Sequence, residues 1–143
     1  MGVLCLILSG CPLAGNGSIV GTWTVESVSD TGSGTLRSTR TFQYNADGIW
    51  VDNETFEEPV SGTWTEIAAG RYRTYFEESE IFNERFLITV IVESEVAVVG
   101  NTIAGTTVQV SRTQTLCEGS QTETCGESSD LIAYSRFTGT RVN

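Results

Sequence analysis

The sequence predicts an all-β domain, folded as an antiparallel up-and-down barrel or half-barrel of about 8–9 strands. Thr, Val, Ile and the aromatic residues are frequent, and they gather in segments that Gly, Asn, Asp and Ser separate. These segments recur at roughly 12-residue spacing, and none shows the period of a helix. Closure into a barrel is favoured because a small antiparallel sheet otherwise exposes unpaired edges. A chain of 143 residues fits a single domain.

The first half of the chain contains five expected strands. They cover residues 19–29, 36–44, 49–52, 60–67 and 71–76. Phe42 and Tyr44 alternate with polar residues, as in a strand with one buried face. The sequence Asn-Ala-Asp-Gly at residues 45–48 predicts a hairpin turn in which Gly48 takes a positive φ. We expect the acidic segments 52–58 and 77–84 to be loops.

The second half predicts further strands at residues 86–92, 96–99, 102–115 and 131–142. The Glu-Ser-Glu sequence at residues 93–95 is expected to interrupt the first two. Residues 86–92 are apolar at both odd and even positions, so we expect this strand to be covered on both faces. Residues 116–130 form a long polar loop before the last strand.

The charge and residue content exclude several classes of function. Eighteen acidic residues outnumber eight basic ones, and the formal net charge is −10. Such a surface repels nucleic acid, because neutralising phosphates requires clustered cations. The chain has no His, which excludes Ser-His-Asp and Cys-His catalytic sites and the usual Cys/His zinc sites. We therefore expect no enzyme activity, no cofactor and no nucleic-acid partner.

Two acidic clusters were considered as calcium sites and as glycosidase-type carboxylate pairs. Their members are Asp52, Glu54, Glu57 and Glu58 in one cluster, and Glu77, Glu78, Glu80 and Glu84 in the other. Neither cluster has the regular spacing of a calcium-binding loop, and both lie on polar segments that would not raise the pKa of a catalytic acid. We expect solvated charges and no metal site.

The first eleven residues are apolar and end in small residues and a Cys. The sequence Leu-Ser-Gly-Cys at residues 8–11 resembles the lipobox of bacterial lipoproteins, which implies cleavage before Cys11 and a lipid on its sulfur. No Lys or Arg precedes this short apolar run, so we expect the true start to lie upstream of Met1. The alternative is a buried first strand that contains Cys11 by chance. The lipoprotein interpretation gives a signal segment (1–10), a flexible tether (11–18) and a barrel domain (19–143), anchored in the bacterial cell envelope on its periplasmic or extracellular face.

Three motifs in order carry a further resemblance. They are Val-Gly-Thr-Trp at residues 20–23, Phe-x-Tyr-Asn-Ala-Asp-Gly at 42–48 and Ser-Gly-Thr-Trp at 61–64. With the lipobox, this pattern resembles the bacterial lipocalin-like domains over about residues 19–76, and over the rest only by the rhythm of strands. The resemblance implies a small antiparallel barrel, often on envelope lipoproteins. In lipocalins a Trp of the first strand packs under an Arg of the last strand, which implies that Trp23 and Arg141 help to close the barrel; the alternative is that Arg141 is a solvated residue at a strand end.

Seven aromatic residues form the candidate ligand site. They are Trp23, Phe42, Tyr44, Trp50, Trp64, Tyr72 and Phe76. An eight-stranded barrel is only just wide enough for its side chains or for one small ligand. The same residues therefore either line a pocket for a small apolar ligand or simply fill the core, and the second reading is favoured.

Cys117 and Cys125 lie eight residues apart in the long polar loop, where an exported chain is expected to form a disulfide. Closing so short a loop stabilises by roughly 2–3 kcal/mol. Three hypotheses for function follow: a lipid-anchored barrel that binds a small apolar ligand, a protein–protein or structural module of the envelope with a filled core, and, least favoured, a hydrolase.

Overall fold

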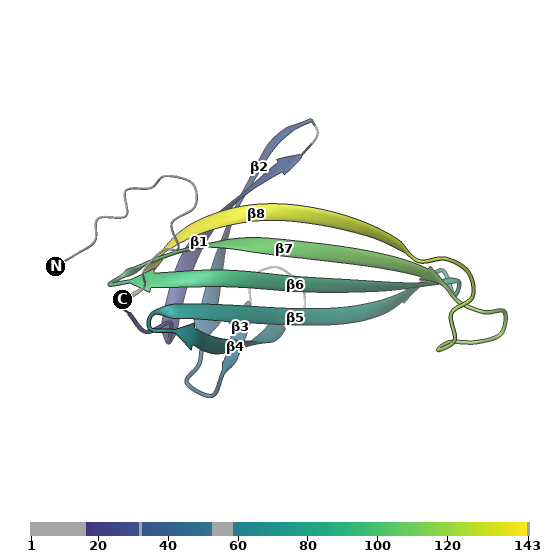
Figure 1. The fold of residues 1–143 in the computed structure, drawn as a ribbon, viewed down its shortest axis with the longest axis horizontal. Coiled ribbons are helices and arrows are strands. Elements are labelled where there is room, and N and C mark those ends of the chain that lie inside the picture. The colour runs from purple at the N-terminus through teal and green to yellow at the C-terminus, as the bar shows by residue number, and fades with distance from the viewer. Residues whose placement is uncertain (1–16, 32, 53–58, 143) are drawn as a thin grey trace.

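The computed structural model describes residues 17–31, 33–52 and 59–142 and shows eight antiparallel strands that close into a barrel in chain order (Figure 1). The strands are β1 (Gly21–Thr31), β2 (Gly34–Tyr44), β3 (Ile49–Asp52), β4 (Val60–Ala68), β5 (Arg71–Phe82), β6 (Phe86–Val99), β7 (Thr102–Thr115) and β8 (Ser129–Arg141). The predicted all-β up-and-down barrel is therefore confirmed. The expected signal segment, Cys11 and most of the tether lie outside the described residues, as do residues 53–58 of the acidic segment 52–58.

The turn after β2 forms as the sequence predicts. Gly48 has a φ of 87°, and its amide donates to the carbonyl of Asn45 at 3.2 Å. The Asp47 carboxylate accepts from the amide of Ile49 at 3.0 Å, which fixes the start of β3. Only a residue without a Cβ adopts this backbone conformation at little cost, so Gly48 makes the turn predictable from the sequence.

Two expectations about β5 and β6 are wrong. The acidic residues 77–82 are not a loop, because β5 continues through them and pairs with β6 as far as Phe82 opposite Phe86. Residues 93–95 do not interrupt β6, which runs unbroken over 14 residues. Charged residues are depleted in strands because a sheet usually buries one face. Here the acidic side chains are exposed, so extending the ladder buries no charge.

The strands differ greatly in length, and this shapes the molecule. β3 has 4 residues, whereas β6 and β7 have 14 each. The outer parts of β5 to β8 therefore extend past the barrel as a four-stranded sheet, while the β1–β2 hairpin bends away from it (Figure 1). We call this extension the distal sheet. It comprises residues 77–82, 86–92, 108–115 and 129–134.

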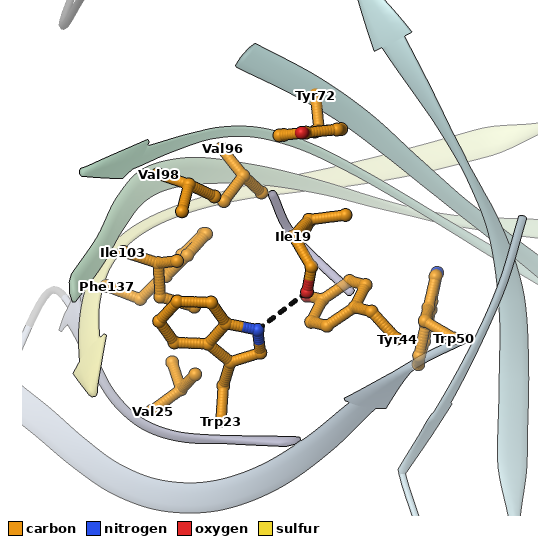
Figure 2. Packing of buried hydrophobic residues seen from close by; sticks show 10 residues of the cluster. All are labelled: Ile19, Trp23, Val25, Tyr44, Trp50, Tyr72, Val96, Val98, Ile103 and Phe137. Atoms are coloured by element: carbon orange, nitrogen blue, oxygen red, sulfur yellow. Dashed lines mark hydrogen bonds between the residues drawn. The ribbon is translucent and has the colours of Figure 1, made fainter. Parts of the chain in front are cut away.

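The expectation that residues 86–92 are covered on both faces is also wrong, because all seven remain partly exposed. β5 and β7 flank β6 along these residues, and none of the seven belongs to the buried apolar cluster. The core lies instead at the other end, the barrel base, where all eight strands surround one apolar cluster (Figure 2). Its buried members are Ile19, Trp23, Val25, Tyr44, Trp50, Tyr72, Val96, Val98, Ile103 and Phe137. None of the described segments forms a helix with the length and hydrophobicity needed to cross a bilayer.

Candidate functional site

The barrel base is closed by Trp23 and Arg141, which lie opposite each other on β1 and β8. The guanidinium carbon of Arg141 lies 4.2 Å from the centroid of the Trp23 ring. Its two terminal nitrogens donate to the carbonyls of Val20 at 2.6 Å and Ser18 at 2.8 Å. The cation therefore joins the last strand to the chain that enters the first. Its contacts are those of a closing residue.

Gly21 makes room for this contact. A Cβ at residue 21 would lie 2.5 Å from the terminal nitrogen Nη1 of Arg141, and the φ of Gly21 is +136°. The Trp23 indole N–H donates to the carbonyl of Ile19 at 2.7 Å (Figure 2), so the wholly buried Ile19 side chain plugs the base. The first Gly-Thr-Trp motif thus supplies Trp23, which binds Ile19 and packs against Arg141, and Gly21, which leaves room for the Arg141 guanidinium.

The end of the expected tether contacts the barrel. The Gly17 amide donates to the carbonyl of Val98 at 3.1 Å, and the Tyr72 hydroxyl donates to the carbonyl of Gly17 at 3.0 Å. With the Arg141 bond to Ser18, these contacts fix residues 17 and 18 against β5, β6 and β8. The chain therefore enters at the barrel base.

The second Gly-Thr-Trp motif plays a similar part at the side of the barrel. The Trp50 ring covers Gly62, and a Cβ at residue 62 would lie 2.5 Å from its Cε2 atom. The Trp64 indole N–H donates to the carbonyl of Asn45 at 3.0 Å, which ties β4 to the β2–β3 turn. Both motifs hold the wall together, and neither opens a cavity.

The seven aromatic residues expected at a ligand site are all in or against the core. Trp23, Tyr44, Trp50 and Tyr72 are buried, and Phe42, Trp64 and Phe76 pack on them partly buried. Phe42 meets Trp50 edge-on at 5.8 Å between ring centroids, and Trp64 meets Tyr72 edge-on at 5.6 Å. Edge-to-face pairs at these distances are the favourable geometry for packed rings. The arrangement fills the interior of the base.

Three polar features of the interior have no clear signal in the sequence. Asp52 is the last residue of β3, and its carboxylate is buried 3.7 Å from Arg40 Nη1, although the sequence placed it in a solvated acidic cluster. The Trp50 indole N–H is buried and has no hydrogen-bond partner among the described residues. Burial also raises the pKa of the Tyr44 hydroxyl well above its usual value. Only the fold reveals these environments, because each depends on which strand end faces inward.

Of the first acidic cluster only Asp52 lies among the described residues, and the described members of the second cluster do not converge. Glu77, Glu78 and Glu80 lie on β5, where successive side chains point to opposite faces of the sheet. Within the described part of the chain, no three acidic or Cys side chains gather as metal ligands do.

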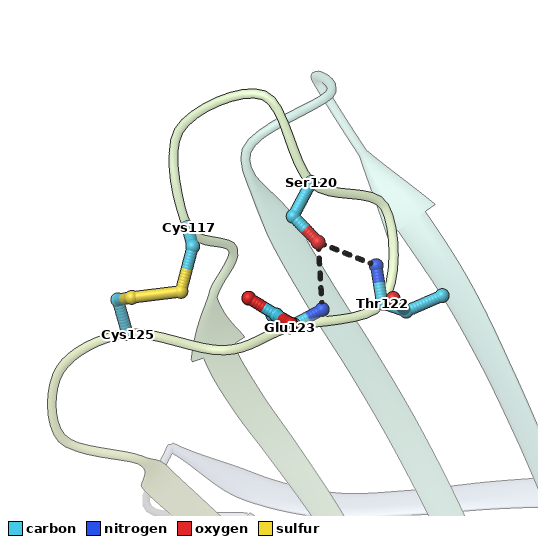
Figure 3. Close-up of a disulfide and its surroundings, with 5 residues drawn as sticks. All are labelled: Cys117, Ser120, Thr122, Glu123 and Cys125. Atoms are coloured by element: carbon cyan, nitrogen blue, oxygen red, sulfur yellow. Dashed lines mark hydrogen bonds between the residues drawn. A yellow bond between two sulfur atoms is a disulfide. The ribbon is translucent and has the colours of Figure 1, made fainter.

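The predicted disulfide joins Cys117 and Cys125, whose Cα atoms lie 4.9 Å apart (Figure 3). Beside it, the Ser120 hydroxyl oxygen accepts from the amides of Thr122 at 3.2 Å and Glu123 at 2.9 Å. The amide of Cys125 donates to the carbonyl of Thr115 at 2.8 Å, so the base of the loop continues the ladder of β7. The disulfide therefore staples the tip of the distal sheet.

The open edge of β8 in the distal sheet was not predicted from the sequence. β1 pairs with β8 only as far as Ser29 opposite Ser135, and residues 129–134 have no described strand on that side. Leu131, Ile132 and Tyr134 are 73%, 52% and 68% exposed. The apolar residues 131–134, at both odd and even positions next to a loop, indicated an exposed strand in the sequence. The point at which β1 stops pairing with β8 could not be predicted from it.

A hollow of about 200 Å³ lies where β1 separates from β8, lined by Val28, Asp30, Tyr134, Ser135 and Arg136.

Comparisons of this chain with protein-family models, with curated proteins and with solved structures found no match. The case for a function therefore rests on the residues and geometry described above.

Proposed function

We propose that this protein is a lipid-anchored module of the bacterial cell envelope that acts through protein–protein contacts, with a lipocalin-like barrel whose interior is filled. The observation that carries the proposal is the packing of the base. The aromatic side chains that would have to line a pocket pack against one another, and Ile19 plugs the same interior. A filled barrel leaves its outer surface and strand edges as the places where binding occurs.

The envelope location rests on two further observations. The lipobox at residues 8–11 is the pattern that lipoprotein processing requires, and the Cys117–Cys125 disulfide is the bond expected of a chain that folds in an oxidising compartment. Entry of the chain at the barrel base, where Gly17 and Ser18 are bound, would direct a tether from Cys11 to that end of the molecule.

The interior is tested with the full chain purified from a bacterial envelope. We expect native mass spectrometry to show no retained small molecule, and an apolar fluorescent probe to produce no saturable quenching of tryptophan emission. Binding of one probe per chain that Phe76→Ala abolishes, and that the exposed control Tyr134→Ala leaves intact, would overturn the filled-barrel proposal.

The anchor is tested separately by intact mass. We expect the wild-type chain to carry acyl groups on a processed amino terminus at Cys11, and Cys11→Ser to remain unprocessed and unacylated. Cys5→Ser is the matched control, because it removes a thiol from the same apolar segment and should leave acylation unchanged. Equal acylation of the Cys11 variant would exclude the lipoprotein assignment without bearing on the interior.

One observation favours a second candidate, a carrier for a small apolar ligand with a hydrogen-bond acceptor. The unpartnered Trp50 indole N–H is a buried donor, and a buried donor without an acceptor costs roughly 1–3 kcal/mol. An acceptor atom of a ligand, next to Phe42 and Phe76, would satisfy it. In that case Trp50→Phe would weaken binding of the probe, whereas a bound water in place of a ligand would leave the probe unbound in both proteins.

A further inference from the structure

Within the described residues the distal sheet has two edges without a neighbouring strand, and they are built differently. The edge of β5 beyond Phe76 carries Glu77, Glu78 and Glu80 ahead of the exposed Ile81 and Phe82, and like charges of this kind oppose edge-to-edge pairing. The edge of β8 carries Leu131, Ile132, Ala133 and Tyr134 instead. One edge is protected by charge and the other is apolar and exposed. The apolar edge is the one suited to receive another strand.

The backbone of β8 shows which groups face outward there. The amide of Val142 donates to Thr22 of β1, whereas the amide of Arg141 donates to Asn101 on the β7 side. Main-chain groups alternate sides along a strand, and the β8 registers with β1 and β7 are free of shifts. Asp130, Ile132 and Tyr134 therefore direct their N–H and C=O groups to the β1 side, which is open at Asp130 and Ile132 and borders Asp30 of β1 at Tyr134. These three residues are symmetric about Ile132.

We propose that β8 pairs along this edge with β8 of a second copy of the chain, antiparallel and two-fold symmetric about Ile132. This inference rests on the proposed function as a protein–protein module and names its partner. In this register Ile132 lies opposite its own counterpart, and Asp130 lies opposite Tyr134 of the second copy. On the other face Leu131 lies opposite Ala133. The outward main-chain groups then face one another, as a ladder requires.

The hollow at the fork between β1 and β8 fits this arrangement. Beyond Tyr134 the edge is occupied by β1, so the chain that precedes Ser129 in the second copy has to leave the sheet there, beside the hollow. Because Arg136 pairs with Val28 of β1, Ser128 and Glu127 of the second copy do not join the ladder there and pass beside the hollow that Arg136 lines. The Arg136 cation then lies near the Glu127 anion, although Asp30 on the β1 wall of the hollow is also acidic.

The chain has a net charge of −10, but its acidic residues are not concentrated at the β8 edge. The Asp130 carboxylate is bound by Arg112 through two hydrogen bonds of 2.9 and 3.0 Å, which also hold the pKa of Asp130 below its usual value. The cation of Arg136 lies on the same strand. The exposed acids of β5 lie at the opposite edge of the sheet. The β8 edge is thus the part of the distal sheet where two acidic molecules can approach.

Sedimentation velocity of the full chain over a range of concentrations is the first test. We expect a reversible dimer, and we expect Ile132→Lys to weaken it about tenfold or more, because the two introduced lysines would face each other across the axis. Leu36→Lys is the matched control: Leu36 is also an exposed apolar strand residue, at 61%, but it lies on the β1–β2 hairpin. Equal weakening by both variants, or a wild-type chain that stays monomeric, would overturn the proposal.

A thiol at the axis gives a second readout that does not depend on dimer strength. Directly opposed residues in a ladder have Cα atoms about 5.5 Å apart, within the range of a disulfide. We expect Ile132→Cys to form a 132–132 disulfide found by non-reducing peptide mapping, and Leu36→Cys to form none. Absence of the 132–132 peptide would exclude this register. A monomer whose barrel holds no ligand because its own side chains fill the interior, and which still binds another envelope protein, would refute the self-pairing and leave the proposed function standing.

Discussion

The two halves of β6 have opposite surroundings: the distal half, residues 86–92, is the more apolar, yet it contains none of the buried residues. Val96 and Val98 in the barrel half are buried, whereas Val90 and its neighbours in the distal half are partly exposed. The difference arises because β1 to β3 lie opposite the first pair and do not reach the second. Burial here is decided by the length of strands on the far side of the barrel. An apolar segment therefore indicates a strand, and the fold decides whether that strand is core or surface.

Truncation at the centre of the base should have the largest effect. Trp23 is wholly buried, carries the bond to Ile19 and supports Arg141. We expect Trp23→Ala to lower the free energy of unfolding by about 3–5 kcal/mol, measured by urea titration. Tyr134→Ala in the distal sheet is the aromatic control. At a protein concentration where the chain is monomeric, it should change the free energy of unfolding by less than about 0.5 kcal/mol. Similar losses would mean that the two regions form one core.

Removal of the disulfide tests whether the distal sheet depends on a covalent staple in place of a core. We expect the double variant Cys117→Ser/Cys125→Ser to lose roughly 2–3 kcal/mol of stability by the chain-entropy relation for so short a loop. Hydrogen exchange should quicken first at the amides of Leu116 and Cys125, which hold the loop base. Ser120→Ala is the control within the same loop. Unchanged stability would show that the ladder of β7 and β8 suffices at the tip.

A pair of substitutions in β6 sharpens the comparison within one strand. Val98→Ala removes two methyl groups from a sealed site, and we expect it to cost about 2 kcal/mol. Val90→Ala makes the same change where the side chain is half-exposed, and we expect less than about 1 kcal/mol. Both are measured by chemical unfolding. Equal costs would contradict the assignment of the distal half to the surface.

The last effect concerns pH and is absent near neutrality. Because burial raises the pKa of Tyr44, the folded state keeps this proton at pH values where the unfolded chain, with a tyrosine pKa near 10, has released it. Stability that is fully present below about pH 10 should then fall by up to about 1.4 kcal/mol per pH unit above it. Tyr44→Phe should lower this slope, leaving the smaller part due to Tyr75, whose pKa its hydrogen bond to Glu77 raises, and Tyr134→Phe, at an exposed site, should keep it. A slope that is unchanged in Tyr44→Phe would assign the alkaline loss to other groups.

Local chemistry explains what the sequence predicts well. The turn at Gly48 and the Cys117–Cys125 loop depend on a few adjacent residues, and both are as expected. Strand alternation also places Trp23 and Val25 on the interior face. The errors arose where distant strands decide the outcome. Acidity at residues 77–82 indicated a loop, because nothing local shows that this part of β5 has solvent on its faces.

The candidate interaction site shows the same limit. The apolar character of residues 131–134 is visible in the sequence, but the open edge exists only because β1 leaves β8 after Ser29. The buried state of Asp52 likewise depends on its place at the end of the short β3. Such features belong to the ends of ladders, and the position where a ladder ends is set by partners far away in the chain.

The clamp between Arg141 and Val20 joins residues 121 positions apart. Contacts of such long sequence separation form late, because the intervening chain must be ordered first. A chain that crosses a membrane amino terminus first therefore delivers β1 long before the strand that completes its ladder. Until β8 arrives, such a chain is an open sheet with two free ends, and under the proposed export the ring forms only when the whole domain has crossed.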